Sequence, residues 1–371
     1  MKKRLLAMLM AGTMALSMTA CGGGGASDGG EAADGGEAAE GAAKIGVSMP
    51  TQSLQRWNQD GSNMKEQLEA AGYEVDLQYA GDNDIPTQVS QIENMIAGGC
   101  DALVIAAIDG SALTEALKGA SENNIPVISY DRLIMNSDAV SYYATFDNYK
   151  VGQMQGEYIR DALDLDNAAG PFNIELTTGA PDDNNVNFFF GGAMDVLQPY
   201  IDSGKLVVLS GQTEKAQCAT ANWSTEEAQK RFENIITSVG YGPDGVKLDA
   251  VLCSNDSTSY GVQNALQAAG YTADNMPIIT GQDCDKPNVK NLVSGLQSMS
   301  VFKDTRTLAD ATVKMVDAIV KGTEPEINDT ETYDNGTGII PSYLCDPVIV
   351  TKDNYEEILI DSGYYTAEDV A

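Results

Sequence analysis

The alternation of short apolar runs with segments of helical spacing constrains this fold most, and Asp101–Arg132 shows it best. Ala102–Ile108 is a short apolar run rich in β-branched residues, which is typical of a strand buried on both faces. Leu113–Asn123 has apolar residues at helical spacing, and Pro126–Asp131 is a second buried run. The segment is therefore a β-α-β unit of about 30 residues, whose crossover we expect to be right-handed.

The same unit recurs at Asp249–Asp283, where an apolar strand, a helix and the strand Pro277–Thr280 follow one another. Polar residues stand at the carboxyl ends of the strands in both units: Asp109, Asp131 and Arg132 in the first, and Asn255, Asp256, Gln282 and Asp283 in the second. In open α/β sheets, ligands bind at that edge. We therefore expect two similar α/β halves that face each other across a cleft.

Strand and helix alternate along most of the chain, which indicates parallel α/β sheets. Outside the two units, the expected strands are 44–49, 74–79, 141–146, 172–177, 205–209, 295–303 and two runs within 338–350. The expected helices are 56–71, 85–97, 151–163, 185–197, 225–239, 305–320 and 354–360. Two such series suggest two Rossmann-like domains. The first strand-to-helix turn of neither series carries a GxGxxG fingerprint, and the sequence has no GxxxxGK[ST] motif, so we expect no nucleotide cofactor.

The N-terminus has the features of a secretory signal peptide over residues 1–20. A basic start is followed by the apolar stretch Leu5–Met18 and by small residues before Cys21. This order resembles the lipobox of bacterial lipoproteins, so we expect lipidation at Cys21; the alternative is a plain signal peptide with a chance Cys. Residues 21–43 are rich in Gly, Ala and Glu and read as a flexible acidic tether. The protein would then lie outside the cytoplasm, attached to the cell membrane only through its lipid.

Composition excludes several classes of function. The formal net charge is -32, which disfavours contact with nucleic acid and acidic lipid. The chain has no His, which excludes His-based triads, His general bases and His metal ligands. Beyond Cys21, five Cys remain without a CxxC pair, so we expect no metal site. We expect these Cys to be free, mostly buried thiols, with one or two disulfides as the alternative.

Two aromatic side chains are candidates for stacking on a sugar ring. Trp57 and Trp223 are the two Trp of the chain, and both stand among polar neighbours. A Trp of the core would normally have apolar neighbours, and a flat indole face fits the apolar face of a sugar. The alternative for each is a partly buried structural Trp.

Polar candidates follow the expected strands. Asp131 and Arg132 together could bind adjacent hydroxyls, or form an ion pair that ends the strand. The run Asp182–Asn185 lies in a strand-to-helix loop, where helix capping is the alternative for each residue, and Asn184 and Asn185 are its chosen candidates. Further candidates are Asn255 and Asp283 at strand ends and Lys303, which ends an apolar run.

Five segments of this sequence resemble the ChvE-like multiple-monosaccharide-binding proteins, which are solute receptors of sugar ABC importers. The segments are Pro50-Thr51 followed by Arg56-Trp57, Ser129–Arg132, Tyr142–Asn148, Pro181–Asn185 and Gly281–Asp283. The resemblance runs in order from about Lys44 to Tyr365. It implies an α/β type I periplasmic-binding-protein fold, with two Rossmann-like domains joined by a three-crossing hinge and a ligand cleft between them.

The resemblance also implies domain boundaries and ligand contacts. The N-terminal domain would comprise 44–146 and 303–339, and the C-terminal domain 147–302 and 340–371. The hinge crossings would lie near Phe146–Asp147, Val301–Lys303 and Ile340–Tyr343. The implied sugar contacts are Arg56, Trp57, Asp131, Arg132, Asn184 or Asn185, Trp223, Asn255, Asp283 and Lys303. One departure is visible, because Ser-Thr follows Trp223 where the family more often has Asp-Pro.

The function that the resemblance implies is that of a non-enzymatic receptor. Hinge closure would capture an aldose such as xylose, arabinose, glucose or galactose, and a membrane ABC permease would receive it. We expect a monomer that binds neither cofactor nor nucleic acid. One alternative is a sensor that presents its sugar to a chemoreceptor or a histidine-kinase ectodomain. Another is an extracellular carbohydrate-active enzyme, since carboxylates are plentiful. A LacI-type repressor is excluded, because no helix-turn-helix precedes the first strand.

Overall fold

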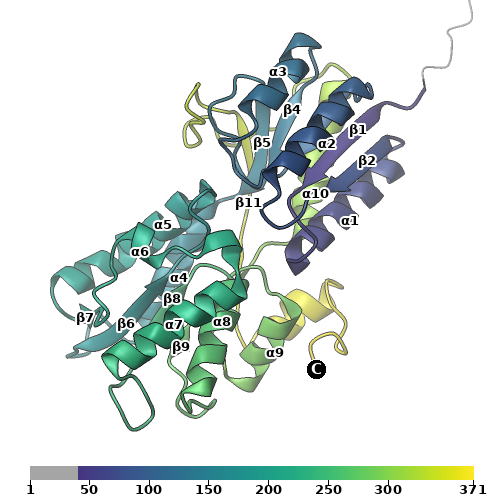
Figure 1. Ribbon diagram of the computed structural model, residues 1–371. Helices are drawn as coiled ribbons and strands as arrows, with labels where there is room; N and C mark the ends of the chain where they lie inside the picture. Colours follow the sequence, from purple (N-terminus) through teal and green to yellow (C-terminus); the bar gives the residue numbers. More distant parts are fainter. Residues whose placement is uncertain (1–40) are drawn as a thin grey trace, which may run out of the picture. The chain divides into compact units, whose positions relative to one another are not determined.

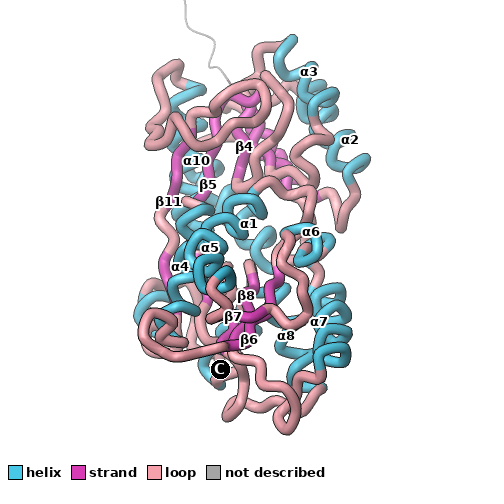
Figure 2. Tube along the Cα trace, turned by 90° about the vertical axis from the view of Figure 1, so that its left-hand side faces the viewer, coloured by secondary structure: helices cyan, strands magenta, loops and turns pink. Residues whose placement is uncertain are grey.

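The computed structural model describes residues 41–371. The expected signal peptide, the lipidation site at Cys21 and nearly all of the tether lie outside the described residues. Within 41–371, none of the helices combines the length and the apolar character that a membrane crossing requires. The strands gather into two groups, and each group is the centre of one lobe (Figure 2).

The first lobe is built on a six-stranded parallel sheet in the order β11-β5-β4-β3-β1-β2 (Figure 1). The strands are β1 Lys44–Met49, β2 Glu74–Tyr79, β3 Ala102–Ile105, β4 Val127–Tyr130, β5 Val140–Phe146 and β11 Ser342–Cys345. Helices α1 (Gln55–Ala70) and α10 (Thr305–Val320) cover one face, and α2 (Ile85–Ala97) and α3 (Thr114–Glu122) cover the other. Burial on both faces explains why the central strands are continuous apolar runs.

The second lobe has a four-stranded parallel sheet in the order β7-β6-β8-β9. These strands are β6 Phe172–Thr177, β7 Leu206–Val207, β8 Ala250–Cys253 and β9 Ile278–Ile279. A bridge between Gln282 and Val301 adds the antiparallel pair β10 (Ser300–Phe302) and β12 (Val348–Val350). The remaining elements are α4 Asn148–Ala162, α5 Asn185–Asp202, α6 Lys215–Cys218, η1 Ala221–Trp223, α7 Thr225–Val239, α8 Asp256–Ala268, α9 Lys286–Ser294 and η2 Glu356–Asp361.

Helices α4 and α5 approach each other closely because glycines line their contact. A Cβ atom at Gly152 would lie 2.1 Å from the carbonyl oxygen of Phe189, and one at Gly192 would lie 2.2 Å from that of Tyr149. No side chain larger than hydrogen fits at these positions without a shift of the backbone. The contact sets how closely α4 and α5 pack, and Asn185 is the first residue of α5.

The chain passes between the lobes three times: between β5 and α4, between β10 and α10, and between β11 and β12. We expected residues 340–371 to belong to the second lobe. This is wrong for residues 342–345. Strand β11 pairs with β5 of the first sheet as far as Cys345, so the third crossing lies at Asp346-Pro347 rather than near Ile340–Tyr343. The physical reason is a long-range pairing: Ser342–Cys345 completes the edge of the first sheet beside β5.

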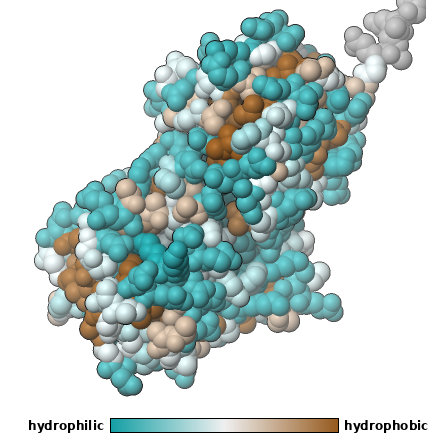
Figure 3. All heavy atoms as spheres, viewed as in Figure 1, coloured by the Kyte–Doolittle hydropathy of each residue, from teal (hydrophilic) through white to brown (hydrophobic). Residues whose placement is uncertain are grey.

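Hydrophilic residues cover most of the face in Figure 3. The large apolar side chains exposed on the described residues lie on separate elements and loops; they are Leu209, Val246, Val320, Ile327, Ile339 and Val348. Apolar residues scattered singly are normal on a soluble surface. The feature that needs a functional explanation is therefore the polar pocket between the lobes.

Candidate functional site

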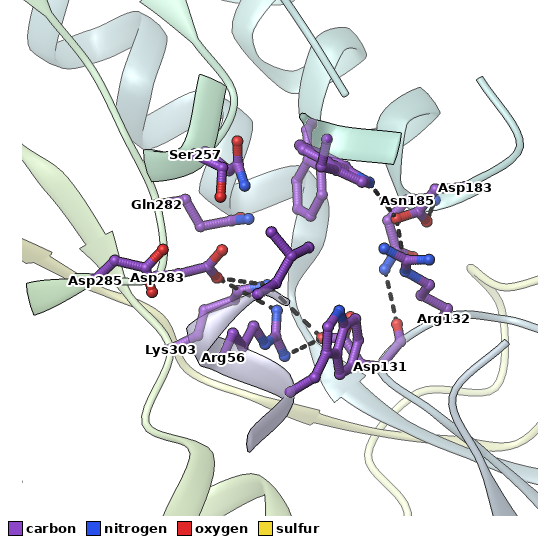
Figure 4. A pocket seen from close by; sticks show the side chains of 15 residues that line it. Arg56, Asp131, Arg132, Asp183, Asn185, Ser257, Gln282, Asp283, Asp285 and Lys303 are labelled. Atoms are coloured by element: carbon purple, nitrogen blue, oxygen red, sulfur yellow. Dashed lines mark hydrogen bonds and ion pairs between the residues drawn. The ribbon is translucent and has the colours of Figure 1, made fainter. Parts of the chain in front are cut away.

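A pocket of about 400 Å³, counting the space open to solvent, lies where the carboxyl ends of both sheets meet (Figure 4). Both lobes contribute to it, as expected for ligands of parallel α/β sheets. Its lining consists of Leu54, Arg56, Trp57, Asp131, Arg132, Asp183, Asn185, Phe189, Trp223, Asn255, Ser257, Gln282, Asp283, Asp285 and Lys303.

Arg56 is the centre of the ion pairs in this pocket. Its guanidinium contacts Asp131 and lies 3.0 Å from Asp60 and 3.3 Å from Asp283. Lys303 lies 3.4 Å from Asp283 and 3.7 Å from Asp131. Burial opposes the charge of Arg56, but Asp131, Asp60 and Asp283 raise the pKa of the guanidinium well above its ordinary value. The cluster therefore joins carboxylates of the two lobes through two buried cations.

Burial raises the pKa of the two carboxylates beside Arg56, whereas the neighbouring cations lower it. Burial raises the pKa of Asp131, but Arg56, Lys303 and Arg132 together hold that pKa below its ordinary value. Asp60 lies beneath the pocket and accepts a hydrogen bond from the hydroxyl of Tyr130. Burial raises the pKa of Asp60 to about 6 despite its contact with Arg56. Asp131 is therefore the carboxylate that stays ionised over the wider pH range.

The backbone at Asp131 is held in an uncommon conformation. Asp131 directly follows β4 and has a φ of +58°. Asp283, which follows β9, has a φ of +96°. The carbonyl oxygen of Asp131 accepts hydrogen bonds from Tyr143, from Thr145 at 3.0 Å and from the Asn185 amide at 2.8 Å. Left-handed backbone at non-glycine residues persists only where the surroundings fix it, and it concentrates at binding sites. The two strand-end carboxylates are thus oriented in advance.

The other end of the pocket is organised by Asp183. This carboxylate lies 3.0 Å from Arg132 and accepts a hydrogen bond of 3.2 Å from the indole nitrogen of Trp223. Gly179 permits that placement, because a Cβ atom there would lie 2.1 Å from the Trp223 ring. Phe189 packs edge-on against the same ring, with 6.2 Å between centroids. The position of Trp223 is therefore fixed from three sides.

Trp57 lies on the first lobe, in the first turn of α1. The guanidinium carbons of Arg56 and Arg132 are each 5.1 Å from the centre of its indole ring. These contacts are cation–π interactions, which favour a fixed orientation of the ring. One indole from each lobe thus lines the pocket.

Comparison with known proteins identifies this architecture. The periplasmic binding protein domain family matches residues 45–324. The chain belongs to this family. The curated relatives include the multiple sugar-binding periplasmic receptor ChvE of Rhizobium radiobacter, 52% identical over 87% of this chain and 91% of the relative. The D-xylose-binding periplasmic protein of Escherichia coli (strain K12) is 36% identical over 87% of this chain and 91% of the relative.

A solved structure of a periplasmic binding protein agrees with this membership. An ABC transporter solute-binding protein from Clostridium phytofermentans, with bound β-D-glucose, is 64% identical and superposes with a TM-score of 0.86. The match covers 88% of this chain and 100% of that chain. The type I fold and the resemblance noted in the sequence are thereby confirmed. Members of this family bind solutes without transforming them, so the chain is a binding protein and not an enzyme.

The structure gathers nearly all expected site residues of this periplasmic binding protein in one pocket. The expected residues that line it are Arg56, Trp57, Asp131, Arg132, Asn185, Trp223, Asn255, Asp283 and Lys303. Asn184 does not line it, because it precedes α5 and its side chain accepts a hydrogen bond from Asn187. Asp256, another polar strand-end residue, is buried behind the pocket among Gln297, Ser300 and the backbone of Asp285.

Several lining residues were not among the expected sugar contacts. Asp183 stands beside Asn184 in the expected loop, and Gln282 precedes Asp283, so their positions were a usable signal. Phe189 lies in a run of three Phe, a pattern that is typical of the buried side of a helix. Asp285 lines the pocket with its Oδ1 buried and without a hydrogen-bond partner among the described residues. Burial, followed by the neighbouring Asp283, raises the pKa of Asp285 to about 7.

The cysteine and metal expectations concern residues that the structure describes. Cys100, Cys218, Cys253, Cys284 and Cys345 are all buried free thiols, which confirms that preference over disulfides. Among residues 41–371, no group of three or more Cys, Asp or Glu is arranged to hold a metal ion.

Proposed function

We propose that this periplasmic binding protein captures an aldose monosaccharide in the pocket between its lobes and delivers it to an ABC importer. The observation that carries the proposal is the pairing of one indole per lobe with a buried cluster of cations and carboxylates. Support comes from relatives whose names record binding of several sugars or of xylose, and from a solved relative that holds β-D-glucose.

The pocket suits hydroxyl groups at its rim and the apolar face of a sugar ring at its centre. Arg56, Lys303 and Arg132 offer donors, and Asp131, Asp283 and Asp183 offer acceptors. Asn185 and Asn255 add amides that can do both. Trp57 and Trp223 would stack on the ring. Hydroxyls that replace direct contacts between Arg56 and Asp283 would stabilise the closed arrangement, because the ligand binds both lobes only when they are closed.

The cellular part of the proposal rests on the N-terminal sequence. Lipidation at Cys21 would anchor the protein outside the cytoplasm, and the acidic tether would let a monomer reach its permease. A sensor role is the second candidate for the closed form. Copurification with permease subunits or with a sensor ectodomain would separate these two roles.

A thermal-shift screen tests the sugar-binding proposal. The chain from residue 41 would be screened against arabinose, xylose, ribose, glucose, galactose, fucose, glucuronate and galacturonate. A ligand at 100 times its Kd adds about 2.7 kcal/mol to the free energy of unfolding, which raises Tm by a few degrees. We expect shifts with several aldoses. The absence of a shift with every sugar would refute the proposed ligand class.

A further inference from the structure

The side chain of Gln55, at the start of α1 in the first lobe, bonds to two groups of the second lobe. Its amide nitrogen donates a hydrogen bond of 2.6 Å to the hydroxyl of Tyr365. Its amide oxygen accepts a hydrogen bond of 3.2 Å from the backbone N–H of Lys286, the first residue of α9. Gln59, one turn further along α1, donates to the same Tyr365 hydroxyl at 3.4 Å. Both ends of the Gln55 amide are therefore used across the boundary between the lobes.

The bond from Lys286 gives α9 a capping partner that its own N-cap residue does not supply. The first N–H groups of a helix have no partner within the helix, and the side chain of the N-cap residue commonly accepts from one of them. Asp285 is the N-cap residue of α9, but its side chain makes no capping hydrogen bond. Gln55 thus caps a helix of the other lobe. Opening of the cleft would break this contact and return the N–H group to water.

Tyr365 is held firmly on the side of the second lobe. Its ring is buried in an apolar cluster that includes Cys284, and its hydroxyl donates a hydrogen bond of 2.9 Å to the carbonyl oxygen of Cys284. Burial raises the pKa of this hydroxyl above its ordinary value, so the group stays neutral and keeps its proton. Cys284 directly follows Asp283, which lines the sugar pocket. Tyr365 therefore connects Gln55 to the loop that carries Asp283.

Gln55 and Tyr365 stand outside the sugar pocket. Inside it, Arg56 contacts Asp283 across the lobes, and the hydroxyls of a ligand would compete for both of these groups. Neither Gln55 nor Tyr365 lines the pocket, so a bound sugar can leave their hydrogen bond in place. Contacts that form only on closure raise the fraction of protein that is ready to bind, and the apparent affinity increases with that fraction.

We propose that Gln55 and Tyr365 are positioning residues for sugar binding, which hold the loop of Asp283 against Arg56 by bonding the two lobes together beside the pocket. Their bond would keep part of the unliganded protein closed and would slow the release of a bound sugar. The effect on affinity rests on the proposed function. The effect on closure concerns the protein without any ligand, so it can be measured separately.

Variants that remove single polar groups test this proposal. Tyr365→Phe removes only the hydroxyl, and Gln55→Ala removes the amide. The double variant shows whether the two side chains act as one unit, because coupled residues give non-additive effects. Tyr158→Phe is the matched control, since the Tyr158 hydroxyl also donates to a backbone carbonyl, that of Ser298 at 3.1 Å, but within the second lobe.

Two measurements would be made on each variant of the chain from residue 41. The first is the distance between the lobes, with and without glucose, from double electron–electron resonance between spin labels at Glu122→Cys and Asp244→Cys. Both positions are exposed, one in each lobe, whereas the five native Cys among the described residues are buried. The second is the Kd of glucose by calorimetry and its release rate by stopped flow.

We expect Tyr365→Phe and Gln55→Ala each to shift the lobe distances of the unliganded protein toward longer, open values. Each should also raise the Kd and the release rate of glucose about three- to tenfold, which is the range for loss of one or two hydrogen bonds. The double variant should differ less than twofold from the weaker-binding single variant. Tyr158→Phe should leave the distances, the Kd and the release rate unchanged.

Unchanged lobe distances in both single variants would overturn the proposal, even if glucose binds. An equal rise of the Kd in Tyr365→Phe and Tyr158→Phe would also overturn it, since loss of any buried hydroxyl would then explain the effect. Losses that multiply in the double variant would show that the two side chains do not act as one unit. If the distances shift as expected but neither glucose nor any other aldose binds, the proposed function is overturned and the bond between the lobes is confirmed.

Discussion

The guanidinium of Arg56 in the first lobe lies 3.3 Å from the carboxylate of Asp283 in the second lobe. The same guanidinium contacts Asp131 and Asp60, so one side chain neutralises three carboxylates beneath and across the pocket. Arg56 is therefore central to the ligand site and to the stability of the first lobe.

Replacing Arg56 should destabilise the protein strongly. Arg56→Ala leaves Asp60 and Asp131 buried without their main cation, and breaking a buried ion pair in this way costs about 3–5 kcal/mol. Lys65→Ala on the same helix is the matched control, since Lys65 and its partner Glu69 are about half exposed and such pairs contribute about 0.3–0.5 kcal/mol. Urea unfolding measures both. Similar losses for the two variants would show that the buried cluster adds no stability.

Replacing the ring of Trp223 should weaken sugar binding more than it weakens the fold. Trp223→Phe keeps an aromatic ring against Phe189, but removes stacking area and the hydrogen bond to Asp183. Buried Trp residues in binding sites commonly contribute about 2 kcal/mol or more to affinity, which is about thirtyfold in Kd. Titration with an aldose, together with the Tm of the unliganded variant, checks this. An unchanged Kd would place the sugar away from Trp223.

A methyl group at position 179 should displace Trp223. In Gly179→Ala the added Cβ would lie 2.1 Å from the indole ring, so the ring must move. We expect affinity to fall at least tenfold. Gly191→Ala in α5 is the control, because nothing lies within 4 Å of its Cβ and alanine favours a helix by about 1 kcal/mol over glycine. Equal affinities in both variants would contradict the role of Gly179.

The stability of the protein should fall as pH rises from about 4 to about 7. Burial raises the pKa of Asp285 to about 7 in the folded state, whereas an unfolded Asp releases its proton near pH 4. The folded state therefore binds more protons within that window, and the free energy of unfolding decreases as pH increases. Asp60, with a pKa of about 6, adds to the same slope.

The variant Asp285→Asn isolates this effect from that of the other carboxylates. Urea unfolding at pH 5, 6, 7 and 8 should show a shallower decrease for the variant than for the original protein. Asp244→Asn, at an exposed loop position, should leave the slope unchanged. If Asp285→Asn shows the same slope as the original protein, Asp285 ionises normally in the folded state.

The apolar pattern of the sequence correctly predicted helices and strands that bury one side within their own lobe. The helix expected at 85–97 and the strands at 44–49 and 172–177 match the structure, because their apolar periodicity reflects burial in one lobe. Helix α9 was missed, since Lys286–Ser294 is a short, mostly polar helix. The sheet to which Ser342–Cys345 belongs was missed as well, because that depends on pairing with β5, about 200 residues earlier in the chain.

The same limit applies to the candidate site, because the position of a residue after a strand does not show whether its side chain reaches the pocket. Asp109 and Asp131 both follow buried strands, but Asp131 lines the pocket while Asp109 accepts a hydrogen bond from the backbone of Ser111 in its own loop. Their difference lies in the left-handed backbone of Asp131 and in the neighbours that hold it. Asp285 was missed for a similar reason, since only the three-dimensional arrangement shows that its Oδ1 lacks a partner.

A crystal structure of the chain from residue 41 with a bound aldose tests the central claim most directly. We predict a sugar ring between Trp57 and Trp223, with hydroxyls bonded to Arg56 and Asp131 of the first lobe and to Asp283 of the second. A sugar bound outside this pocket, or held by one lobe alone, would contradict the account.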